Sequence, residues 1–148
     1  MLKHYRMQLD TLYTFFRSCP DPNAREHDDG WCTKQILGHL LDSVSNNHQR
    51  LLRFRPGQTL QFPAYDQVSF VTRAHYSSFD YMDLLTLWYL HNQLLLHIIE
   101  HIPVDDMGSL IEVGDQPAIT IKQLIADYYA HMEIHHRQAI RICEKNRV

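Results

Sequence analysis

The chain has 148 residues, of which 45% are hydrophobic and 21% charged, a composition typical of globular proteins. We expect a single domain over residues 1–148, because this length suits one hydrophobic core and leaves little material for a second. The 14 basic and 17 acidic side chains give a formal net charge of -3, without the basic excess of nucleic-acid-binding proteins. We therefore expect no nucleic-acid partner.

Other features bear on the compartment in which the protein works. The opening residues lack the apolar run of a secretion signal, and no later stretch approaches the roughly 18 uninterrupted apolar residues of a membrane span. The three cysteines, Cys19, Cys32 and Cys143, are odd in number and widely spaced, which is typical of reduced thiols. These features predict a cytoplasmic protein with no membrane partner.

Four segments have the apolar period of amphipathic helices. They cover about residues 2–17, 33–54, 78–101 and 120–142, with Thr33 and Thr120 as the expected N-caps of the second and fourth helices. Helices that each carry one apolar stripe bury it most simply against one another. The pattern therefore predicts an all-α fold, a four-helix bundle.

Two connections between these helices are long enough to carry structure. Residues 58–77 have no sustained period and contain one apolar run, VSFV, so we interpret them as an ordered loop that crosses the bundle. In residues 104–119, LIEVG and PAIT flank the pair Gly114-Asp115, so a small β-hairpin can form before the fourth helix.

Histidine is the unusual component, with 11 copies, three of them within the stretch AHMEIHHRQ. His131 and His135 are four residues apart, so on a helix both imidazoles can reach one metal ion. They also share the inward-facing track of the fourth helix with Leu124 and Tyr128. The alternative is a pair of hydrogen-bonded core histidines. His136 lies off that track and is more simply a packing or subunit-contact residue.

A second pair, His97 and His101, has the same spacing but shares its track with polar residues, which makes a metal site there a weak prediction. Two ligands from one helix need a third from a neighbour. In the second helix the candidates are His39, on the shoulder of the apolar stripe, and His48, nearer the exposed end. Periodicity favours His39 without deciding between them, and Gly38 would permit close approach of another helix.

The stretches WCTKQILGHLLDSVSNNHQRLLRF, FPAYDQ and LIADYYAHMEIHHRQAI, in this order, resemble the DinB-like/YfiT-like superfamily of metal-dependent enzymes over nearly the whole chain. The resemblance implies an up-down-down-up bundle with one long crossover between its second and third helices. It also implies metal ligation by His39, His131 and His135, and so selects His39 over His48. In one departure, Ile134 stands where related sequences often have a histidine before the last ligand.

The same resemblance implies a homodimer, to whose contact Trp88, Tyr89 or Phe70 could contribute. Three neutral imidazoles leave coordination positions open, as in catalytic rather than closed structural sites. They do not choose the divalent metal, for which we rank Zn and Ni before Fe and Mn.

We therefore predict a metal-dependent enzyme acting on a small-molecule substrate. The resemblance implies either a hydrolase or a thiol S-transferase that uses a low-molecular-weight thiol. Catalytic acids and bases are not evident. Asp42, Tyr65, Asp66 and Tyr128 are candidates by proximity to the motifs, and for each of them a structural role is the stronger interpretation. The alternative function is a non-catalytic bundle with a structural metal or a protein-interaction role.

Overall fold

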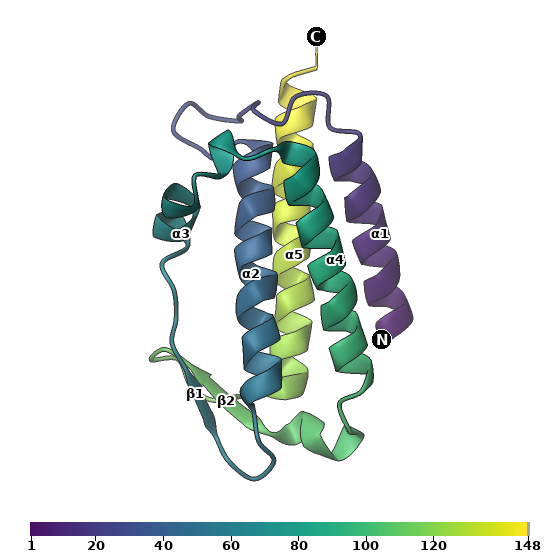
Figure 1. The fold of residues 1–148 in the computed structure, drawn as a ribbon, viewed down its shortest axis with the longest axis vertical. Helices are drawn as coiled ribbons and strands as arrows, with labels where there is room; N and C mark the ends of the chain where they lie inside the picture. Colours follow the sequence, from purple (N-terminus) through teal and green to yellow (C-terminus); the bar gives the residue numbers. More distant parts are fainter. Residues whose placement is uncertain (148) are drawn as a thin grey trace.

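The computed structural model describes residues 1–147 and is dominated by four long helices (Figure 1). These helices are α1 (Leu2–Arg17), α2 (Thr33–Arg53), α4 (Tyr81–Glu100) and α5 (Ile121–Lys145). In the view of Figure 1, α1 and α5 run upward while α2 and α4 run downward. The predicted four-helix bundle with up-down-down-up topology is thus confirmed.

The helix ends follow the capping signals of the sequence, with one shift. Thr120 caps α5 as predicted, because its hydroxyl accepts a hydrogen bond from the backbone N–H of Gln123. Thr33, the other expected cap, is instead the first residue of α2. The cap is Cys32, whose backbone N–H donates to the side-chain oxygen of Gln35.

The apolar stripes of the four helices meet in one core. Trp88 of α4 lies fully buried in it, with its ring edge-on to Phe16 of α1. This burial corrects the expectation that Trp88 contributes to a subunit contact, since no part of its side chain reaches the surface. Within residues 1–147, no helix combines the length and apolar character that a membrane crossing needs.

The crossover between α2 and α4 is more regular than the ordered loop that we predicted. It contains strand β1 (Leu60–Phe62), helix α3 (Gln67–Ala74) and the 3-10 turn η1 (Tyr76–Ser78). The run VSFV lies in α3, which is too short for a helical period to stand out in the sequence. Asp66 caps this helix by accepting from the backbone N–H of Ser69.

The predicted hairpin is confirmed at the lower end of the bundle (Figure 1). It follows the 3-10 turn η2 (Val104–Gly108) and pairs β2 (Leu110–Val113) antiparallel with β3 (Ile119–Thr120). Strand β1 adds to it in parallel, with Leu60 opposite Ile111. This pairing joins segments far apart in the chain, so no local pattern could predict it, and it fastens the crossover to the start of α5.

Candidate metal centre

The candidate centre begins with two histidines one turn apart on α5. His131 and His135 project from the same face of the helix, and their Nε2 atoms are 3.1 Å apart. This follows from the spacing of four residues, which places successive side chains on one face.

The third histidine comes from α2, which packs beside α5. His39 is fully buried, and its Nε2 lies 3.0 Å from the Nε2 of His131. One nitrogen from each of the three rings lies within 4.8 Å of the other two. For comparison, two imidazole nitrogens on one tetrahedral zinc ion, each at a Zn–N distance of about 2.1 Å, are roughly 3.4 Å apart.

The second histidine of α2 lies elsewhere. The Nδ1 of His48 is 2.9 Å from the Nε2 of His91 on α4, so these two imidazoles satisfy each other. Periodicity left the choice between His39 and His48 open, and in the structure it is His39 that lies beside His131.

The three clustered imidazoles are held in the neutral form that binds metals. Burial, followed by the nearby His135 and His131, lowers the pKa of His39 to about 3. Burial, followed by His135, lowers the pKa of His131 to about 4. Burial also lowers the pKa of His135, with the hydrogen bond to Gln138 acting in the opposite direction.

Neutral imidazoles alone cannot satisfy this arrangement. The Nδ1 of His135 must donate to the Oε1 of Gln138, 2.8 Å away, because an amide oxygen only accepts. The Nε2 of His135 then carries a lone pair. The Nε2 of His131 can hold one proton or one lone pair, so it cannot form a proper hydrogen bond to both His39 and His135.

A cation that accepts all three lone pairs removes this conflict, so the donor set fits a divalent metal ion. Gln138 then has the role of a partner that fixes the tautomer of a ligating histidine. Trp31 packs beside the rings of His39 and His135, with centroids 5.0 and 6.5 Å away, and covers this side of the centre. The Nδ1 of His39 is buried and has no hydrogen-bond partner among residues 1–147.

A cleft of about 290 Å³ lies beside His131. Its lining includes Ser43, Asn47 and Arg50 from α2, Tyr65 from the crossover, and Tyr128 and His131 from α5. We call it the α2–α5 cleft. Arg50 was not among the predicted site residues, although it shares the helical track of His39.

Two of the four weak catalytic candidates, Tyr65 and Asp42, lie in or near this cleft. Tyr65 lines the cleft, and burial followed by the charge of Asp42 raises its pKa, so its hydroxyl keeps its proton. Burial likewise raises the pKa of Asp42. One oxygen of Asp42 accepts a hydrogen bond from the hydroxyl of Tyr76, while the other is buried and has no partner in the described chain.

The other two candidates have structural roles in the fold. Asp66 caps α3 through its bond to Ser69. Tyr128 is buried at the edge of the cleft and donates its hydroxyl proton to the side-chain oxygen of Asn92, 2.6 Å away, on α4. Both roles agree with the structural interpretation that the sequence favoured.

Gly38 has a different role from the one expected. A Cβ atom at this position would lie 2.2 Å from the ring of Tyr76, so the glycine makes room for a side chain of η1 and not for another bundle helix. Tyr76 then reaches Asp42, one turn after Gly38. Through this contact the crossover is fastened to α2 next to His39.

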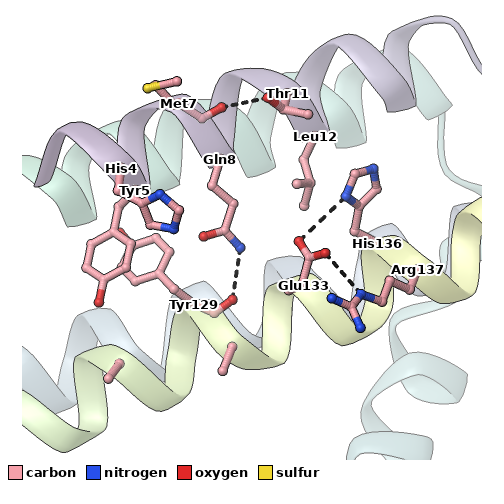
Figure 2. Close-up of a pocket in the computed structure, with 12 residues that line it drawn as sticks. His4, Tyr5, Met7, Gln8, Thr11, Leu12, Tyr129, Glu133, His136 and Arg137 are labelled. Atoms are coloured by element: carbon pink, nitrogen blue, oxygen red, sulfur yellow. Dashed lines mark hydrogen bonds and ion pairs between the residues drawn. The ribbon is translucent and has the colours of Figure 1, made fainter. Parts of the chain in front are cut away.

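A larger cavity, of about 580 Å³, lies between α1 and α5 (Figure 2). None of the three clustered histidines lines it, and several of its polar groups contact one another. As Figure 2 shows, Gln8 donates to the backbone oxygen of Tyr129, and Glu133 contacts both Arg137 and His136. His136 packs between the helices, edge-on to Phe15 of α1, which is one of the two roles predicted for it. The hydroxyl of Tyr129, also in this lining, is buried and has no hydrogen-bond partner among residues 1–147.

The other histidine pair of equal spacing lies on the surface. His97, Glu100 and His101 are grouped closely enough for a metal, but all three are exposed. Glu100 already pairs with Arg6 at 3.2 Å, and the Nδ1 of His101 donates to the backbone oxygen of His97. The environment expected for this pair, a polar face, is the one observed.

Two solved structures share this architecture. YfiT from Bacillus subtilis, a probable metal-dependent hydrolase with an unusual four-helix bundle topology, matches 97% of this chain and 86% of its own, with a TM-score of 0.85 and 15% identity. The mycothiol-dependent maleylpyruvate isomerase matches 93% of this chain with a TM-score of 0.66 and 12% identity. This chain spans only 58% of the isomerase.

No protein-family model matches the sequence, and no curated protein matches it significantly. The structural comparison confirms the predicted fold, which this chain shares with YfiT. At these identities, it establishes the fold of the chain and leaves the chemistry to be argued from its own residues.

Proposed function

We propose that the protein is a metal-dependent enzyme in which His39, His131 and His135 hold one divalent ion beside the α2–α5 cleft. The grouping of the three Nε2 atoms carries this proposal, because the Nε2 of a neutral His131 cannot hydrogen-bond properly to both the His39 Nε2 at 3.0 Å and the His135 Nε2 at 3.1 Å. Three protein ligands leave coordination positions free for other groups, which is the arrangement of catalytic sites. Zn²⁺ and Ni²⁺ are our first candidates, before Fe²⁺ and Mn²⁺.

Hydrolysis of a small ester or amide is the reaction that we favour. An ion in this ligand set supplies Lewis acidity and lowers the pKa of water bound to it. The likeness to YfiT, a probable metal-dependent hydrolase, extends over most of both chains and supports hydrolysis. The mycothiol-dependent isomerase makes transfer to a low-molecular-weight thiol the second candidate.

The residues of the chain have separate tasks in this proposal. Gln138 orients the imidazole of His135, and Trp31 keeps water from the covered side of the centre. Tyr65, whose raised pKa keeps its hydroxyl protonated, is placed in the cleft to donate a hydrogen bond to a substrate.

Activity with and without metal tests the proposal. The purified protein would be stripped with a chelator, reloaded with Zn²⁺ or Ni²⁺, and assayed on a panel of esters and amides with and without cysteine as the thiol. We expect activity from the reloaded wild type and from a His97→Ala control, and none from the stripped protein or from His131→Ala. A metal that binds and stabilises the protein in every assay without any turnover would instead support a structural metal.

A further inference from the structure

The most unusual charged side chain outside the histidine cluster is Arg50. It lies on α2 with only 8% of its surface exposed, and its Nε is buried without a hydrogen-bond partner among residues 1–147. In the part of the chain that the structure describes, no carboxylate lies within ion-pair distance of it. The guanidinium lies over the ring of Phe62, whose centroid is 5.2 Å from the guanidinium carbon.

Three other arginines show the opposite arrangement. Arg6, Arg137 and Arg141 are exposed, and each contacts a glutamate at 3.1 to 3.4 Å. Burial of a charge without a counter-ion is unfavourable, whereas an exposed charge is hydrated and needs none. Arg50 is therefore a buried arginine to which the described residues offer no carboxylate, and it lines the α2–α5 cleft.

We propose that Arg50 is the anion-binding residue of the α2–α5 cleft and holds the carboxylate of a small organic acid derivative whose reactive group lies at His131. This inference rests on the proposed function for the reacting end of the ligand, while the binding end is argued from Arg50 alone. A guanidinium presents paired N–H donors that match the two oxygens of a carboxylate.

The lining of the cleft selects a singly charged ligand. Arg50 is the only Lys or Arg in the lining, and Asp127 lies there too, so a doubly charged phosphate would face one cation and one repelling carboxylate. Ser43 and Asn47, which lie between His39 and Arg50 on α2, add polar side chains to the lining of the cleft. A monocarboxylate fits this charge pattern best.

The size of the cleft limits the rest of the ligand. Its volume of about 290 Å³ is at the lower end of ligand pockets. On α5 the lining runs from Leu124 to His131, a rise of about 10 Å at 1.5 Å per residue. A ligand with its carboxylate and its reactive group a few bonds apart, such as an N-acyl amino acid or a short dicarboxylic monoester, spans this length.

Binding of benzoate, with benzamide as its neutral counterpart, tests the inference without any turnover. The titrations would follow the Arg50 Nε–H signal and the backbone amides by NMR, in metal-free and Zn²⁺-loaded protein. We expect benzoate to shift the Arg50 signal in both forms and to bind at least tenfold more tightly than benzamide. Inorganic phosphate should bind more weakly than benzoate.

Three variants separate a ligand contact from a structural role. Arg50→Met should lose at least tenfold in benzoate affinity while keeping its metal and its Tm, because it removes a buried unpaired charge at similar length. Arg50→Lys keeps the charge and loses the paired donors, so it should also bind benzoate less tightly than the wild type. It replaces Arg50→Met in the test if Arg50→Met does not fold. Arg53→Met, an exposed cation one turn along α2, is the matched control and should leave benzoate affinity unchanged.

The inference is overturned if benzoate fails to bind, if Arg50→Met and Arg50→Lys both bind it like the wild type, or if its binding disappears on metal removal alone. Failure of the proposed function looks different. A protein that binds benzoate through Arg50 but takes up no divalent metal would refute the metal centre and leave the role of Arg50 standing.

Discussion

His131/His135 on α5 and His97/His101 on α4 are pairs of equal spacing in opposite environments. The α4 pair is exposed to water, and its neighbours Glu100 and Arg6 satisfy each other. The α5 pair faces α2, where the buried His39 brings a third imidazole whose nitrogen competes for the same space. A spacing of four residues determines only that the two imidazoles of a pair lie side by side. Whether the pair can form a metal centre depends on the side chains that the neighbouring helix brings to it.

Among the tests of this comparison, metal removal should produce the largest change in stability. A ligand present at about 1,000 times its Kd stabilises a folded protein by about 4 kcal/mol, so we expect a chelator to lower the Tm by roughly 8–16 °C. Differential scanning calorimetry with and without chelator measures this shift. The same shift should occur in His97→Ala, because the α4 pair holds no metal in this account, and an unchanged Tm in the wild type would contradict it.

The second largest effect should come from replacing one histidine of the α5 pair, with the same replacement in the α4 pair as the comparison. His131→Ala should weaken Zn²⁺ binding by more than about a hundredfold, since even the loss of a residue that only orients a ligand costs 10- to 100-fold. Competition with a chromogenic chelator gives the two affinities. His97→Ala is the matched control, and an equal loss in both variants would mean that spacing alone accounts for binding.

The packing beside His39 offers a third test. Gly38→Ala should destabilise the protein by about 1–3 kcal/mol, because the new methyl group would overlap the ring of Tyr76 and disturb its bond to Asp42. Urea unfolding followed by circular dichroism measures this change. Gly108→Ala, where a Cβ would meet nothing within 4 Å, should stay within about 0.5 kcal/mol of the wild type.

Gln138 supports the α5 pair only indirectly, so its effect should be the smallest. Gln138→Ala should lower Zn²⁺ affinity roughly tenfold, because the imidazole of His135 loses the acceptor that fixes its tautomer. Gln138→Glu keeps an acceptor at this place and should retain the affinity. If both substitutions leave the affinity at its wild-type value, Gln138 does not orient His135.

Much of the fold could be predicted because the four long helices have strong apolar periods and clear boundaries, such as the Thr120 cap. Strand β1 and helix α3 could not, since a three-residue strand paired with a distant partner and an eight-residue helix leave little local pattern. For the candidate centre, the α5 pair was visible in its spacing. The choice of His39 needed either the resemblance or the packing that sets His48 against His91.

Arg50 shows the limit of sequence reasoning at the site. An arginine on the shoulder of an amphipathic helix is ordinarily a surface residue. Phe62 of β1 lies against the guanidinium of Arg50, and the position of Phe62 depends on the pairing between β1 and β2. The burial of Arg50 is thus a consequence of tertiary contacts that no window of the sequence contains.

The metal content of the purified protein and of His39→Ala, measured by mass spectrometry, tests the central claim most directly, because His39 is the ligand that joins α2 to α5. We predict about one divalent ion per chain in the wild type and in a His48→Ala control, and less than about a tenth of that in His39→Ala. A wild-type protein that takes up no divalent metal, or a His39→Ala variant that keeps it, would contradict this account.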